Sequence, residues 1–241
     1  MIHLAHVSSM MIGRRSVSLS KTYVVISSFL SLIGIAFANA GPAIRGLGQN
    51  ATGSVGGVDP GSLLSLVSVP MLVFAAILFT TPVLLLFVYD KNNGVLEYFL
   101  SLGMDQGELF RSYLKAALLL GAIVVCAEIL LTTIVGLVVG SALSLLVEIA
   151  LLTPLIALSV ISFVVVIMMA FSSLQKQRVG SNQPLGIAIG VFLVMPTYIL
   201  PFIFPTFAVY IDLAVAAVIV VLATSAFVLS SKLIRREKFL P

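Results

Sequence analysis

Residues 89–115, YDKNNGVLEYFLSLGMDQGELFRSYLK, are the longest polar stretch of the chain and lie between two long apolar runs. The whole sequence is 60% hydrophobic and 9% charged, and its mean hydropathy is +1.21. This composition is typical of an integral membrane protein and excludes an ordinary soluble domain. Because a helix needs roughly 20 apolar residues to cross a bilayer core, we predict an all-α, polytopic membrane protein.

Six apolar runs are long enough to cross, and each is flanked by polar or turn-forming residues. We expect a cytoplasmic amphipathic segment at residues 1–22, followed by a six-helix transmembrane domain at residues 23–241. The predicted spans cover residues 23–40, 64–89, 116–140, 143–171, 185–204 and 208–230.

The fifth predicted span has an unusual outer end, crowded by Pro196, Pro201 and Pro205. Proline removes a backbone donor and frees a carbonyl group, and both effects must be accommodated inside protein or water. A broken or partly re-entrant end is therefore an open alternative to a continuous helix.

The basic residues indicate the orientation. Twelve of the thirteen Lys and Arg residues fall in the N-terminal segment, the 90–115 loop, the 172–184 loop and the C-terminal tail, whereas the opposite side carries only Arg45. By the positive-inside rule these four segments are cytoplasmic. We therefore expect a multi-pass protein of the plasma membrane with both termini in the cytoplasm.

The predicted outer loop, residues 41–62, is rich in Gly and Ser. It contains Asn50-Ala51-Thr52, the acceptor pattern for N-glycosylation. Asn50 is a candidate for modification in a host that glycosylates, although such triplets also occur by chance.

Several kinds of chemistry are not expected in this chain. Cys126 is the only cysteine, and the only histidines are His3 and His6 near the N-terminus, so we predict no metal site and no catalytic residues. The sequence lacks a Gly-rich loop ending in Lys-Ser or Lys-Thr, which argues against nucleotide hydrolysis. The basic residues are dispersed, which argues against binding to nucleic acid. We expect a protein that is not itself an enzyme.

The 90–115 loop, called the elbow below, has a regular pattern. Asn92 to Gly94 predict a turn, the apolar residues from Val95 to Leu102 recur at helical spacing, and Gly103 predicts the end of that short helix. Asp105 and Glu108 have the spacing of a capping box. The pattern predicts a short helix, a sharp corner and a second helix continuous with the third span. A helix that only lies on lipid headgroups is the alternative.

This order of residues resembles the intracellular loop of type-2 ABC exporter permeases. The usual family run is approximately Glu-Arg, Gly-Thr-Leu-Glu, Leu-Leu, Ser-Pro and later Gly-Lys. The residues that match in order are Gly94, Leu96, Glu97, Leu100, Ser101 and Lys115. The departures are Val95 for the common Thr, Gly103-Met104 near the usual Pro, and Tyr113-Leu114 in place of the Gly before Lys115.

The resemblance implies an ATP-driven exporter in which this loop is a coupling helix that docks on a separate cytoplasmic ATPase subunit. ATP and Mg²⁺ would bind to that partner, and two permease subunits, identical or closely related, would form the path. Residues 1–22 would form a connecting helix along the inner membrane surface. The implied contacts with the ATPase are Leu96, Glu97, Leu100, Ser101, Leu102, Gly103, Met104 and Asp105.

Three acidic residues fall within the apolar runs, and Glu128 lies near the centre of the third span. A charge there costs about 2.5–3.5 kcal/mol on an insertion scale, so Glu128 should face protein, a partner subunit or water. Together with Thr132 it either contributes to a substrate path or dimer seam, or forms a neutral carboxyl bonded to Thr132, Thr133 or a neighbouring helix. Glu148 and Asp212 lie near the outer surface and are expected to be hydrated.

Two other functions fit the residues. A secondary transporter could be driven by protons through Glu128, and a subunit of a larger membrane complex could have only an assembly or anchoring role. The exporter interpretation is the one that uses the elbow.

Overall fold

The computed structural model describes residues 2–40, 60–141, 143–170, 183–204 and 207–233. These residues contain helices and turns and no strand, so the predicted all-α class is confirmed. The helices are α1 (Ile2–Leu19), α2 (Lys21–Ala38), α4 (Pro60–Asn92), α5 (Val95–Ser101), α6 (Gln106–Val139), α7 (Leu143–Ala170), α8 (Gln183–Ile203) and α9 (Ala208–Leu233).

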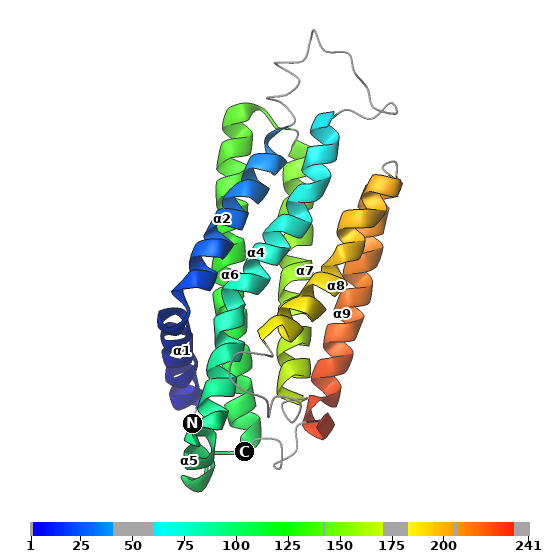
Figure 1. The fold of residues 1–241 in the computed structure, drawn as a ribbon. Helices are drawn as coiled ribbons and strands as arrows, with labels where there is room; N and C mark the ends of the chain where they lie inside the picture. The colour runs from blue at the N-terminus through cyan, green and yellow to red at the C-terminus, as the bar shows by residue number, and fades with distance from the viewer. Residues whose placement is uncertain (1, 41–59, 142, 171–182, 205–206, 234–241) are drawn as a thin grey trace.

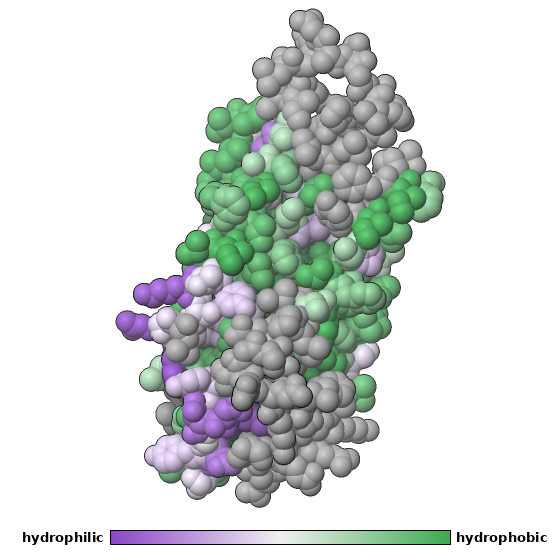
Figure 2. All heavy atoms as spheres, viewed as in Figure 1, coloured by the Kyte–Doolittle hydropathy of each residue, from purple (hydrophilic) through white to green (hydrophobic). Residues whose placement is uncertain are grey.

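The long helices lie side by side in an elongated bundle, and α5 lies at one end of it (Figure 1). Hydrophobic side chains cover much of the described surface, whereas hydrophilic side chains gather at the end that carries α5 (Figure 2). This separation is typical of a protein embedded in a bilayer with one polar end outside it.

Five of the described helices contain a segment that is long and apolar enough to cross a membrane: α2, α4, α6, α7 and α9. Five of the predicted runs are therefore helices with the length and apolar composition that a membrane span needs. The described part of α8 includes a shorter apolar segment, Ala188–Thr197, so a sixth crossing stays a prediction. The α8 helix is continuous through Pro196 and Pro201 as far as Ile203.

Helix α4 is the centre of the bundle. Within its apolar segment 72% of the residues are buried, against 22% for α6, and it packs against α2, α6, α7 and α8. Two prolines, Pro70 and Pro82, lie inside this helix. Because α4 continues into the first residues of the elbow and ends at Asn92, the elbow is attached to a largely buried helix.

Helix α1 lies beside α4 and α6 (Figure 1). It presents small residues to the bundle: Ser9 and Ser16 are buried, and a methyl group on Gly13 would contact Leu120 of α6. The exposed side carries Met11. Small residues at this helical spacing allow close helix contact. A position along the inner membrane surface stays a prediction.

Candidate functional site

The elbow begins with a turn that only glycine adopts readily. Helix α4 ends at Asn92, and Gly94 has φ 71°, in the left-handed region, as the N-cap residue of α5. Other L-residues pay about 1–2 kcal/mol in this conformation. The turn predicted at Asn92 to Gly94 is therefore present, and it redirects the chain from α4 into α5.

A second left-handed glycine ends α5. The φ of Gly103 is 83°; its N–H donates to the carbonyl of Leu100 at 3.1 Å, and the N–H of Met104 donates to Phe99 at 3.2 Å. This pair of bonds is the Schellman motif, which satisfies carbonyl groups that the end of a helix leaves free. The predicted end of the short helix at Gly103 is thus present.

The second helix of the elbow starts at a side-chain cap. Asp105 is extended, with φ −73° and ψ 144°, and its carboxylate accepts a hydrogen bond from the N–H of Gly107 at 3.1 Å. From this cap α6 continues without interruption over 34 residues. At 1.5 Å per residue it is about 50 Å long, roughly 20 Å more than a bilayer core. The elbow and the third predicted span therefore share one helix.

The implied ATPase contacts differ in exposure. Leu96 is completely buried in the main hydrophobic core, so its side chain anchors α5 and is not available to a partner. Glu97, Leu100 and Met104 are half-buried. The exposed contacts are Ser101, Leu102, Gly103 and Asp105.

Two large side chains protrude from the elbow. Tyr98 is 61% exposed and Leu102 is 62% exposed, and they stand four residues apart, about one helical turn. The apolar pattern had grouped Leu102 with the buried side of the helix. It stands one turn after exposed Tyr98 and six residues after buried Leu96, so it lies on the exposed side of the helix and not on the buried side. Tyr98 was not among the predicted contacts.

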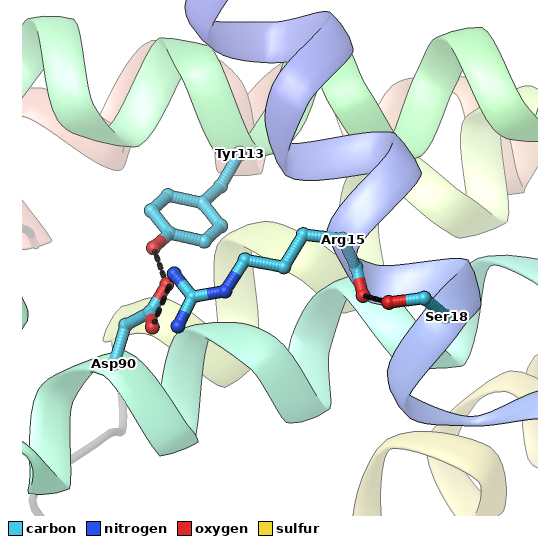
Figure 3. Close-up of polar contacts among 4 residues, drawn as sticks. All are labelled: Arg15, Ser18, Asp90 and Tyr113. Atoms are coloured by element: carbon cyan, nitrogen blue, oxygen red, sulfur yellow. Dashed lines mark hydrogen bonds and ion pairs between the residues drawn. The ribbon is translucent and has the colours of Figure 1, made fainter.

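A polar cluster ties the two arms of the elbow together (Figure 3). The hydroxyl of Tyr113 on α6 donates to Asp90 Oδ2 on α4 at 2.7 Å, and Arg15 Nη1 of α1 lies 3.1 Å from Asp90 Oδ1. The Asp90 side chain is 3% exposed and that of Arg15 is 48% exposed. The Tyr113 ring also packs edge-on against Phe87 of α4, with centroids 5.3 Å apart. These contacts hold α4, α6 and α1 together at the base of the elbow.

Glu128 is buried between α6 and α2, at 2% exposure. Ser31 Oγ lies 2.5 Å from Glu128 Oε1 and 3.0 Å from the carbonyl oxygen of Ser27. A hydroxyl donates one hydrogen bond at a time. Ser31 therefore donates to either the Glu128 carboxyl or the Ser27 carbonyl at any one time.

Two buried oxygens on this face have no hydrogen-bond partner within the described residues: Glu128 Oε2 and Thr132 Oγ1. They stand four residues apart on α6, and such groups in native proteins usually bind water or a ligand. Asp212 on α9 is also buried, at 1% exposure, and its Oδ1 has no partner within the described residues, so its hydration stays a prediction. Asn50 lies outside the described residues.

Comparison of the chain with protein-family models, with curated proteins and with solved structures found no match. The function is therefore argued from the residues and their geometry.

Proposed function

We propose that this chain is the membrane-spanning permease subunit of an ATP-driven exporter, and that its elbow docks on a separate cytoplasmic ATPase. The resemblance of residues 94–115 to the family loop supports the proposal. The observation that carries it is the elbow itself: a short helix, fixed between two left-handed glycines, with exposed Tyr98 and Leu102 at its tip.

The shape of the elbow suits transmission of force. A flexible loop absorbs a displacement, but α5 is anchored by buried Leu96 and is tied to α4 and α6 through Asp90 and Tyr113. Closure of two ATP-bound ATPase subunits would bring two elbows together. Each α6 would then tilt as a unit, and the seam between two permease copies would open to the other side of the membrane.

The first test is purification of the protein from its native membrane with its companion chains. We expect a nucleotide-binding companion with the wild-type chain and its loss in Leu102→Glu, because a charge replaces the exposed apolar contact. Met11→Glu is the matched control, since Met11 is 68% exposed on α1 and lies outside the elbow. Equal retention of the companion by Leu102→Glu and wild type would refute docking at the elbow.

The unpaired Glu128 Oε2 supports a second candidate function, transport driven by protons. The substitution Glu128→Gln keeps the size of the side chain and lets its amide group donate to Ser31, but it cannot release a proton. If the protein is an exporter driven by ATP, Glu128→Gln should retain substrate-stimulated ATP hydrolysis by the companion. Loss of transport in a folded Glu128→Gln protein, with transport that collapses with the proton gradient, would favour the secondary transporter.

A further inference from the structure

A groove of about 710 Å³ is lined by residues of α6, α7 and α9 and by Ser9 of α1. Helix α6 runs away from the elbow, whereas α7 and α9 run toward it (Figure 1). Early residues of α6 therefore lie at the same end of the groove as late residues of α7 and α9. Lys115, Ser162 and Phe227 lie at the elbow end, and Ala122 and Leu158 lie farther along the bundle. The groove follows the bundle axis over roughly 12 Å, because α6 rises 1.5 Å per residue.

The lining of the groove is mainly apolar. It is mostly Leu, Ala and Val and contains no acidic residue. Two of its four hydroxyl side chains donate within their own helices, Ser162 to the carbonyl of Leu158 and Thr224 to that of Val220. Such a surface suits a hydrocarbon chain better than a polar ligand.

Lys115 places a positive charge at one end of this groove. It is exposed, and it stands immediately before the apolar run that starts at Ala116. No acidic side chain in the described ranges forms an ion pair with it. Lysine at the end of an apolar run places its ammonium group at the depth of the lipid headgroups, where it attracts anionic lipid.

We propose that this groove binds one anionic phospholipid, with its phosphate on Lys115 and one acyl chain along α6, α7 and α9. Two observations select this occupant: the apolar groove adjoins a positive charge that forms no ion pair with an acidic side chain of the described ranges, and that charge lies at the boundary of the apolar run. A bound lipid of this kind would join α6, the helix that continues from the elbow, to α9. The proposal is independent of the exporter function, because it requires only that the chain lies in a bilayer.

Native mass spectrometry of the full chain, with phosphatidylglycerol or phosphatidylcholine of identical acyl chains, tests the proposal. We expect preferential retention of phosphatidylglycerol, and we expect Lys115→Gln to reduce it about fivefold, the effect of one surface charge. Arg111→Gln is the control, since Arg111 is exposed on the same helix but does not line the groove. Equal retention by the two variants would overturn the assignment of the phosphate to Lys115.

A second pair of variants tests the acyl-chain part of the site. Ala122→Phe fills the groove and should lower retention of both lipids, whereas Ala127→Phe, on an exposed part of α6 outside the groove, should leave retention unchanged. Thermal unfolding in detergent checks that both variants are folded. Unchanged lipid retention by Ala122→Phe would overturn the proposal. Loss of a dimer rather than of lipid would also overturn it, because the groove would then hold a second copy.

Discussion

Asp90 is the residue on which the base of the elbow depends. It accepts a hydrogen bond from Tyr113 and lies in an ion pair with Arg15, so three helices meet at one carboxylate. A hydrogen bond to a charged group contributes about 1.5–3 kcal/mol, and a buried group left unpaired costs a similar amount. The single side chain therefore affects both stability and the position of α6 relative to α4.

We expect Tyr113→Phe and Asp90→Asn each to destabilise the protein by about 1–3 kcal/mol. Because the two side chains are in contact, their double variant should lose less than the sum, with a coupling energy of about 0.5–3 kcal/mol. Equilibrium unfolding in mixed micelles measures all three free energies. Tyr89→Phe is the control, since Tyr89 is a neighbouring tyrosine that is 43% exposed. A coupling energy of zero would mean that the bond does not stabilise the elbow.

The sequence could predict contacts between residues that are close along the chain, but not contacts between residues that are far apart along it. Gly103 and Asp105 act on backbone groups two or three residues away, so local rules identified both. Asp90 and Tyr113 are 23 residues apart, and nothing in the local sequence pairs them. Leu96 and Leu102 shared one apolar pattern, yet one is buried and the other exposed, because six residues place them about 120° apart around a helix.

The elbow is joined to the third span by one uninterrupted helix, α6. The apolar run predicted a span at residues 116–140, and the capping pattern at Asp105 predicted that the helix of this span starts earlier. Helix α6 does begin ten residues before the apolar run, at Gln106. Hydropathy identifies the membrane segment, and it does not identify the helix. Those ten residues are the part that connects α5 to the third span.

Arg111→Pro tests this continuity. Position 111 is exposed, and proline there removes one backbone hydrogen bond and clashes with the preceding turn, at a cost of about 3 kcal/mol. We expect a kink in α6, an ATPase that still binds to the elbow, and transport that is lost. Transport assays in vesicles, together with companion purification, separate the two effects, and Arg111→Gln controls for the lost charge. Full transport by Arg111→Pro would show that α6 need not be rigid.

At the scale of the whole molecule, described helix ends alternate between two ends of the bundle, and α5 lies at the more hydrophilic end (Figures 1 and 2). Composition and apolar run length predicted this organisation because membrane insertion depends on summed hydrophobicity. They could not predict that α4 is central and α6 peripheral, since both runs are similarly apolar, with hydropathy 2.6 in each. That difference depends on which other helices pack against each of them in the folded bundle.

The central claim is that a nucleotide-hydrolysing partner contacts the tip of the elbow on the cytoplasmic side while the chain lies in its native membrane. A photo-reactive amino acid at position 102, in cells, tests it most directly, with the same group at position 29 as control, because Phe29 is 64% exposed on the apolar side of α2. The account predicts that position 102 cross-links to a separate ATPase chain and that position 29 cross-links to lipid or to a second permease copy. Cross-links from position 102 to lipid alone would contradict it.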